Sequence, residues 1–475
     1  MKILKNYLYN AGYQLLVLLL PLITTPYVSR ILGPNGVGDN AYTNSIIQYF
    51  VLFANLGISL YGNREIAYVR ENSKKLTYTF LEIQIVKILT TVIAYTVFIT
   101  FICWYTKYKH YLLLQSLNIV AVLFDISWLY MGLEDFKKTV IRNTLIKIIS
   151  IILIFIFVRS SDDVGIYIFI LAISTLLGNL TLWPFLNDIL DRNIDIKELH
   201  PLRHLKPTIT LFIPQIATQV YLVLNKTMLG VIEGTKYSGF YNYSDSLVKM
   251  VLALATALGT VMLPHIANAF ANKEYDKVNK LLYKSFDYVT AISIPMAFGL
   301  AGIAKTLVPV FYGSGYYPVS KAIMIESIVI VLISWSGTVG TQYLLPTNRV
   351  KQYTTSIILG AMVNIILNFP LITKWGLYGA MMSTVFSELI VTLYQLLCIK
   401  NIVKLNILFT HSTKYIMSGI IMFIPVYIIS LSMNNSIKAI ILELVVGVVV
   451  YSTLIIMLRK ELINEVTKKL KNKRG

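Results

Sequence analysis

Charged side chains inside long apolar stretches are the residues of this sequence most able to do chemistry. Asp245 and Lys249 are four residues apart, so they share one face if their segment is helical. A charge at the centre of a membrane costs ~2.5 kcal/mol or more on insertion scales, so it usually faces a partner or a water-filled cavity. Asp245 and Lys249 therefore form an internal ion pair, or Asp245 orients Lys249 or binds a coupling cation such as H⁺ or Na⁺.

Lys87, Asp125 and Lys147 form a second group of intramembrane charges in three successive apolar segments. Counting ~1.5 Å of rise per residue, each lies roughly 10 Å from the cytoplasmic end of its segment. Their equal depth allows the three side chains to meet. They can serve either as a structural ion pair or as part of a polar cavity. Lys305 and Glu326, near the outer face on adjacent expected helices, are interpreted as a packing pair.

Two stripes of polar residues and one more basic side chain are added to these candidate site residues. Asn44 and Gln48 recur at helical spacing in one segment, Gln219 and Lys226 recur in another, and Arg30 sits at a helix end. If these stripes face one another, they line a net-basic cavity. An anion is the natural occupant of such a cavity, and we expect these residues to bind substrate.

The sequence lacks the patterns of several enzyme classes. It contains no Gly-Lys dipeptide, which excludes a Walker A phosphate loop, and no Asp-x-Asp motif of metal-dependent glycosyltransferases. His200 and His204 are spaced for a metal but lack a nearby Cys or acidic partner in a fixed pattern, so we interpret them as solvated loop residues. We expect no catalytic residues, no metal site and no resident cofactor.

The apolar stretches that carry these residues are long enough to cross a membrane. The chain of 475 residues is 56% hydrophobic and 14% charged, with a mean hydropathy of +0.67. Taking ~20 mostly apolar residues as one crossing, the sequence predicts an all-α integral membrane protein with about fourteen transmembrane helices. Their expected ranges are 8–30, 40–62, 79–104, 111–132, 140–158, 164–186, 208–232, 238–268, 285–311, 320–346, 352–373, 376–399, 415–432 and 437–458.

The 42 Lys and Arg residues fall mostly into every second gap between the apolar stretches. Because basic residues in short loops stay on the cytoplasmic side, this pattern predicts a multi-pass protein with both termini in the cytoplasm. The formal charge of +19 is therefore a topology signal. Nucleic-acid binding is a poorer explanation, since no soluble basic domain is available to carry it.

An internal repeat predicts two similar lobes. Gly38 and Tyr42 match Gly239 and Tyr243, with several neighbouring residues in step. The match pairs the first two expected helices with the seventh and eighth, and an even shift preserves direction through the bilayer. We therefore expect two pseudo-symmetric six-helix lobes with a central site and two extra C-terminal helices. The expected bounds are 1–186 for the N-terminal lobe, 187–207 for a cytoplasmic linker, 208–400 for the C-terminal lobe, and 401–475 for the last two helices and a basic cytoplasmic tail.

Four segments resemble a known family. They are 18–34 (LLLPLITTPYVSRILGP), 57–67 (GISLYGNREIA), 223–230 (VLNKTMLG) and 260–264 (TVMLP). Together they resemble the Wzx-type polysaccharide repeat-unit flippases of the multidrug/oligosaccharidyl-lipid/polysaccharide exporter superfamily. The resemblance extends over essentially the whole chain, and its first segment is the most specific part.

The resemblance implies a function and a set of partners. A member of this family would move an undecaprenyl-diphosphate-linked oligosaccharide from the inner to the outer leaflet of the bacterial cytoplasmic membrane, by alternating access through a cationic cavity. The product would serve capsule, exopolysaccharide or O-antigen synthesis, alongside a polymerase and glycosyltransferases of the same pathway. Lys226 lies inside a matching segment and is the first candidate to meet phosphate or an acidic sugar, followed by Lys249 and Arg30.

Two other classes are weighed against this interpretation. A cation-coupled exporter of small molecules, from the same superfamily, would favour acidic cavity residues, whereas the expected interior is net basic. A membrane polymerase, ligase or glycosyltransferase would need reacting groups on a platform, commonly a sizeable outer loop. No expected outer loop is long enough for that role.

Overall fold

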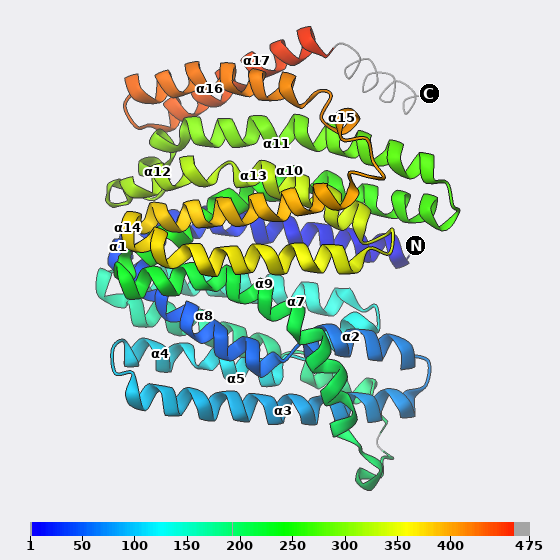
Figure 1. The fold of residues 1–475 in the computed structure, drawn as a ribbon. Helices are drawn as coiled ribbons and strands as arrows, with labels where there is room; N and C mark the ends of the chain where they lie inside the picture. The colour runs from blue at the N-terminus through cyan, green and yellow to red at the C-terminus, as the bar shows by residue number, and fades with distance from the viewer. Residues whose placement is uncertain (1, 192, 460–475) are drawn as a thin grey trace. The chain divides into compact units, whose positions relative to one another are not determined.

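The computed structural model describes the backbone of residues 2–191 and 193–459, and the side chains of that range apart from 2–19, 213–215, 217, 218, 220–222 and 257–261. Over these residues the chain is helical, with no strand (Figure 1). The expected all-α membrane fold is confirmed. The basic tail expected at the C-terminus lies, from residue 460 onward, outside the described residues.

The chain divides into two compact units, residues 1–239 and 240–475. This division falls one helix later than the lobe boundary expected from the repeat. Unit 1 contains α1 (Lys2–Asn55), α2 (Ile58–Val69), α3 (Ser73–Trp104), α4 (Lys109–Gln115), α5 (Leu117–Phe124), α6 (Ser127–Gly132), α7 (Phe136–Phe157), α8 (Val164–Leu180) and α9 (Leu205–Ile232). Helix α10 (Thr235–Ala271) begins in unit 1 and continues into unit 2.

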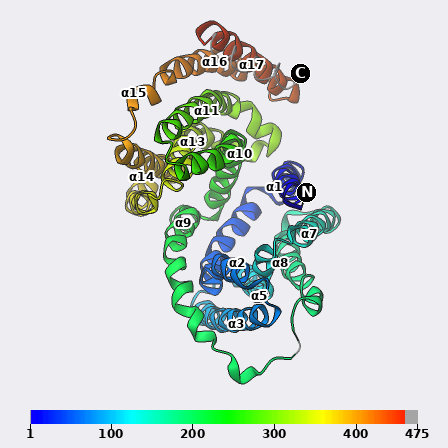
Figure 2. The same cartoon turned by 90° about the vertical axis from the view of Figure 1, so that its right-hand side faces the viewer.

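The remaining helices belong to unit 2. They are α11 (Tyr275–Phe311), α12 (Tyr317–Glu326), α13 (Val329–Val339), α14 (Val350–Ile399), α15 (Leu405–Leu408), α16 (Ser412–Ser432) and α17 (Ile437–Leu458), with a π-helical turn at Gly340–Leu344. Helices α11, α16 and α17 pack side by side, as Figures 1 and 2 both show. Gly302 and Gly419 allow this close approach, because a Cβ at either position would lie under 3.0 Å from a side chain of the neighbouring helix.

Two long helices contain a glycine that breaks them. Gly33 in α1 has φ 64° and ψ 178°, and Gly376 in α14 has φ 54° and ψ −130°, both favoured only by glycine. Helix α14 has 50 residues, and ~1.5 Å per residue would make it ~75 Å long if straight, far more than a bilayer core of ~30 Å. A Cβ at Gly379 would lie 1.9 Å from the Leu371 carbonyl oxygen, so the chain folds back beside Gly376.

Within the described part of the chain, nine helical segments are long and apolar enough to cross a membrane, or ten if α12 and α13 form one bent span. Two of the nine are 50-residue segments that contain Gly33 and Gly376. The protein is therefore a multi-pass membrane protein. The count of fourteen crossings stays a prediction.

Each unit has its own buried core. In unit 1, Trp128 of α6 stacks on Phe80 of α3 with ring centroids 5.5 Å apart. In unit 2, Phe286 of α11 stacks on Trp335 of α13 at the same centroid distance of 5.5 Å. These cores fix the helices that carry the polar residues described below.

Candidate functional site

A cavity of about 420 Å³ opens among α1, α7 and α8 of unit 1. Its wall combines apolar side chains with groups that can bind anions or sugar hydroxyls. The polar lining residues are Thr24 of α1, Arg142, Asn143, Lys147 and Ser150 of α7, and Tyr167, Ser174, Thr175 and Asn179 of α8. The cavity is therefore a polar, basic pocket within membrane helices.

Arg142 is held in the cavity wall by two neutral amide side chains. Its Nε and NH2 donate to Asn143 Oδ1 at 2.9 and 2.6 Å, and its NH1 donates to Asn179 Oδ1 at 3.2 Å. Asn179 is in turn oriented by donating to the Ala121 carbonyl oxygen at 2.7 Å. These amide oxygens accept from the N–H groups of the guanidinium and so orient it in the cavity wall.

The predicted group of Lys87, Asp125 and Lys147 comes together only in part. Lys87 is fully buried and its Nζ donates to the Asp125 carbonyl oxygen at 2.5 Å, while Asp125 Oδ1 accepts from the Ser127 amide at 3.0 Å. The charge of Arg142 also acts on Asp125. Lys147 lines the cavity described above.

Arg142 was missed by the sequence analysis, because it lies near the N-terminal end of α7, where basic residues were interpreted as a topology signal. The sequence does contain a signal that points to Arg142. Asn143 directly follows Arg142, and Lys147 lies five residues after it. Three polar residues within about one and a half turns of an apolar helix indicate a face that does not contact lipid.

The predicted residues of α1 and α9 are partly accessible. Asn44, Gln48 and Lys226 are partly buried, whereas Arg30 and Gln219 are exposed. The two helices are joined at the level of Asn44 and Lys226, because their neighbours contact each other: Thr227 Oγ1 donates to Ser45 Oγ at 2.9 Å. The structure therefore places Asn44 of α1 and Lys226 of α9 at the same level of unit 1.

Unit 2 contains a cluster of three carboxyl groups and one lysine. Lys249 Nζ lies 2.8 Å from Asp245 Oδ2. Glu326 is only 1% exposed, and the charges of Glu326 and Glu388 both act on Lys249. The sequence favoured Lys305 as the packing partner of Glu326; in the structure Glu326 is buried and Lys305 is exposed, and their pairing stays a prediction.

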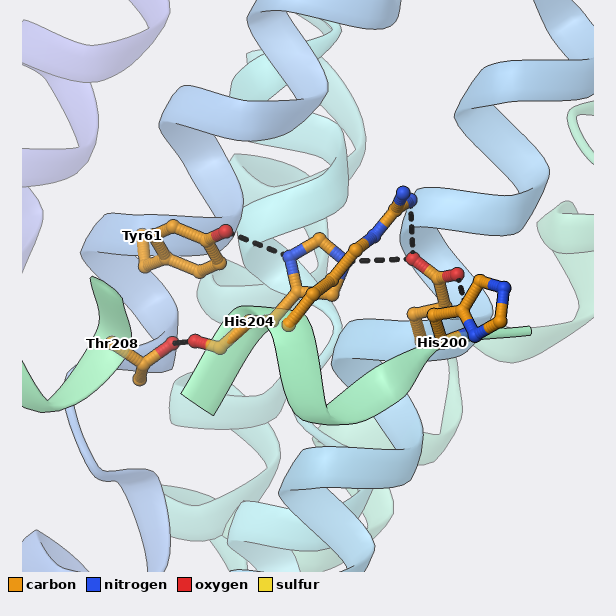
Figure 3. A network of polar contacts seen from close by, with 6 residues as sticks. Tyr61, His200, His204 and Thr208 are labelled. Atoms are coloured by element: carbon orange, nitrogen blue, oxygen red, sulfur yellow. Dashed lines mark hydrogen bonds and ion pairs between the residues drawn. The ribbon is translucent and has the colours of Figure 1, made fainter. Parts of the chain in front are cut away.

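Of the two linker histidines, His200 is exposed as expected, whereas His204 differs from the expectation. His204 is 5% exposed, its Nε2 lies 2.7 Å from Glu82 Oε2, and its Nδ1 lies 2.7 Å from the Tyr61 hydroxyl (Figure 3). Glu82 also accepts from the His200 amide at 2.8 Å and pairs with Arg203 at 2.6 Å. His204 is therefore a buried anchor of the linker rather than a solvated residue. The error arose because its partners are far away in the sequence.

Comparison with known proteins supports a transporter. A curated relative of Escherichia coli (strain K12), named "Putative O-antigen transporter", is 26% identical over 84% of this chain and 96% of its own length. A second curated relative, the lipid II flippase MurJ of Bacillus subtilis (strain 168), is 28% identical over 33% of this chain and 29% of its own length. These relatives are named as a transporter and a flippase rather than as enzymes, in agreement with the expectation of a non-enzyme.

Solved structures share the fold. The lipid II flippase MurJ in an inward closed conformation superposes with a TM-score of 0.78 at 16% identity, over 96% of this chain and 100% of that one. An inward-facing multidrug transporter of the MATE family superposes with a TM-score of 0.60 at 12% identity, over 80% of this chain and 95% of that one. The chain therefore shares its fold with these two transporters.

A family model described as "Polysaccharide biosynthesis protein" matches residues 3–270, more than half of the chain. The segments 18–34, 57–67, 223–230 and 260–264, which carried the resemblance, all lie inside this match. The resemblance is therefore confirmed at the level of the family. The chain belongs to the polysaccharide biosynthesis protein family of membrane transporters.

Proposed function

We propose that this protein is a flippase for undecaprenyl-diphosphate-linked oligosaccharide repeat units. It moves them from the inner to the outer leaflet of the bacterial cytoplasmic membrane for synthesis of capsule, exopolysaccharide or O-antigen. The observation that carries the proposal is a basic cavity within membrane helices of a chain from this family. Both termini are proposed to be cytoplasmic, with the polymerase and glycosyltransferases of the pathway as partners.

The physical need for such a cavity comes from the diphosphate. Transferring an ionised group into hydrocarbon without compensation is prohibitive, so the headgroup needs a polar path while its prenyl chain stays in lipid. Arg142 offers a planar guanidinium suited to phosphate oxygens, and Lys147 adds a second cation to the same wall. The amide and hydroxyl groups around them suit sugar hydroxyls. The arrangement supports recognition of an anionic, sugar-bearing headgroup.

The other predicted substrate contacts remain part of the proposal. Lys226, Gln219, Asn44, Gln48 and Arg30 are proposed to contact the oligosaccharide or its phosphates during alternating access. Lys87 is proposed to act indirectly, by holding the Asp125 carbonyl beside α7. Lys249 and Asp245 are proposed to handle a coupling ion rather than the headgroup, since Lys249 already contacts a carboxylate.

A reconstitution experiment tests the function. The purified full-length protein is placed in liposomes containing an undecaprenyl-diphosphate-linked oligosaccharide with a fluorophore on the sugar, and outer-leaflet arrival is read with an impermeant quencher. The double variant Arg142→Ala/Lys147→Ala is expected to move the lipid at least about tenfold more slowly, because it removes both cations of the cavity. Lys137→Ala, an exposed lysine on the same helix, is the matched control and should match the wild type.

Each result has a defined meaning. A wild-type protein that does not accelerate flipping over empty liposomes contradicts the proposed function. Wild-type flipping with an unchanged double variant would instead exclude the cavity from the path. Both variants are compared with the wild type for thermal unfolding, so that loss of fold is separated from loss of transport.

A cation-coupled exporter of small molecules is the second candidate, favoured by the carboxyl cluster of unit 2. Such a protein would extrude an organic cation against a gradient and would leave the lipid-linked oligosaccharide in its original leaflet. Loading the same liposomes with a fluorescent organic cation separates the two functions.

A further inference from the structure

The membrane segment Lys109–Gly132 of unit 1 is interrupted between α5 and α6. Asp125 has a ψ of 101°, and Ile126 has a φ of −107° with a ψ of 21°, so neither residue continues the helix. These two residues form the α5–α6 break. The segment as a whole is long and apolar enough to cross a membrane. The break therefore frees backbone carbonyl groups that need hydrogen-bond donors from other helices.

Side chains supply those donors. Four of them, from α3, α8 and the turn Trp183–Asp188, each donate to one carbonyl oxygen beside the break. The contacts are Asn179 Nδ2 to Ala121 at 2.7 Å, Gln84 Nε2 to Leu123 at 2.8 Å, Trp183 Nε1 to Phe124 at 2.9 Å and Lys87 Nζ to Asp125 at 2.5 Å. In a continuous helix these carbonyl groups would accept from backbone amides four residues later. The four side chains therefore compete with a continuous helix and hold the break open.

Unit 2 contains the same tripeptide without a break. Residues 126–128 (ISW) recur as residues 333–335 (ISW). In both units the tryptophan of the tripeptide stacks on a phenylalanine, with ring centroids 5.5 Å apart and planes inclined at 25° and 26°. In unit 2 the tripeptide lies inside α13, and the bend of that segment falls earlier, at residues 327 and 328. The tripeptide can therefore be helical, and the surroundings of unit 1 set its break.

The two tryptophans differ in their hydrogen bonds. Trp335 Nε1 donates to Thr290 Oγ1 at 2.9 Å, and Thr290 lies one turn after the stacked phenylalanine. Gln84 holds the matching position in unit 1, yet its Oε1 and the Trp128 Nε1 are both buried without a partner among the described residues. Such an unmade bond costs ~1–3 kcal/mol per group. Turning Gln84 toward Trp128 would satisfy both atoms and release the Leu123 carbonyl, so the break has a second arrangement available.

Asn179 joins the break to the cavity of unit 1. Its Nδ2 donates to the Ala121 carbonyl oxygen, while its Oδ1 accepts from Arg142 NH1 at 3.2 Å. Arg142 and Asn179 both line the cavity. A phosphate competes for Arg142, because a hydrogen bond between two charged groups is stronger than one to an amide oxygen. Once Arg142 turns to a phosphate, Asn179 can donate to the ligand instead of to Ala121.

We propose that the α5–α6 break is a hinge that closes when a diphosphate-bearing lipid binds Arg142, with Asn179 as the positioning residue between them. Loss of the Asn179 contact leaves the Ala121 carbonyl to the amide of Asp125, its partner in a continuous helix. Gln84 then turns to Trp128, and residues 125–132 approach the helical form of α13. The hinge stands on contacts alone, whereas the nature of its ligand rests on the proposed function.

The hinge is tested first without ligand. Full-length protein in lipid nanodiscs undergoes hydrogen–deuterium exchange, and mass spectrometry compares residues 125–132 with residues 332–339, their counterparts around the second tripeptide. The break leaves fewer helical hydrogen bonds in the first range, so exchange there is expected to be severalfold faster. Equal exchange in the two ranges overturns the hinge.

Undecaprenyl diphosphate then tests the coupling. Its binding should slow exchange at residues 125–132 severalfold and leave residues 332–339 unchanged. Undecaprenol, which has the same chain and no phosphate, should change neither range. Asn179→Leu is expected to bind the diphosphate lipid through Arg142 and Lys147 without the slowing. Thr181→Ala is the matched control, because this exposed residue of the same helix end bonds the Gly178 carbonyl at 2.8 Å, and its variant should keep the response.

Gln84→Leu provides an independent variant at another contact of the break. It removes the donor to the Leu123 carbonyl and leaves that carbonyl to the backbone, so exchange at residues 125–132 is expected to slow without any ligand. Exchange in Gln84→Leu as fast as in the wild type overturns the hinge. Residues 332–339 and a thermal unfolding curve report a general folding defect in either variant.

The remaining outcomes separate the hinge from the proposed function. A wild type that does not bind the diphosphate lipid, or that binds it without slower exchange at residues 125–132, overturns the coupling. A response that persists in Asn179→Leu also overturns it, because the signal then does not pass through Asn179. A wild type that responds to the lipid but does not flip it contradicts the proposed function and leaves the hinge standing.

Discussion

Glu82 and His204 lie on different helical elements and contact each other at 2.7 Å, although more than a hundred residues separate them in the sequence. This contact anchors the end of the linker to α3. Tyr61 of α2 completes the anchor by bonding the opposite ring nitrogen of His204. The linker is thereby attached to the core of unit 1 immediately before α9 begins.

Removing this anchor should loosen the linker. His204→Ala leaves the buried Glu82 without one of its partners, and an unsatisfied buried group costs ~1–3 kcal/mol. We expect faster hydrogen–deuterium exchange at residues 193–207, measured by mass spectrometry. Lys197→Ala, which alters an exposed linker residue, is the control and should exchange as the wild type does. Equal protection in His204→Ala would show that the anchor does not hold the linker.

Gly62→Ala should destabilise unit 1. A Cβ at this position would lie 2.4 Å from Trp128 Cε3, and Trp128 is fully buried in the core, so it has no room to move. Overpacking of this kind costs ~1–3 kcal/mol and should lower the Tm. Gly337→Ala is the control, because nothing lies within 4 Å of a Cβ placed there. A Tm for Gly62→Ala equal to that of the control contradicts the packing argument.

Gly33→Ala tests backbone strain without crowding. Nothing lies within 4 Å of a Cβ at Gly33, but its φ of 64° with ψ of 178° belongs to a region adopted almost only by glycine. The expected destabilisation is ~1–3 kcal/mol, read as a lower Tm in detergent. Gly299→Ala in α11 has no positive φ and only one atom at 3.8 Å, so it should change the Tm little. If both variants unfold alike, the break at Gly33 carries no strain.

Asn179→Ala should slow transport through its effect on Arg142. It removes the oxygen that Arg142 NH1 contacts at 3.2 Å and so weakens the orientation of the guanidinium in the cavity. We expect roughly a tenfold lower flipping rate, equivalent to ~1.4 kcal/mol. Thr175→Ala, on the same helix and in the same cavity wall, is the comparison for a simple loss of polarity. A larger loss for Thr175→Ala would mean that Asn179 does not act through Arg142.

Apolar length predicted the all-helical membrane fold well, because it is a local property of the sequence. The relations that define the sites are not local. Lys305 and Glu326 lie in different helices that the sequence could not orient, so their pairing was assigned by depth alone, and the structure leaves one exposed and the other buried. His204 was misinterpreted for the same reason, since Glu82 belongs to a helix that precedes it by more than a hundred residues.

The glycine fold in α14 has a consequence for how the protein is made. Gly376 separates the two arms of this helix almost without a connecting loop, and Gly379 packs directly against the Leu371 backbone. A turn this short keeps the two arms in contact from their first residues onward. It therefore favours insertion of residues 350–399 as one hairpin over insertion as two separate helices.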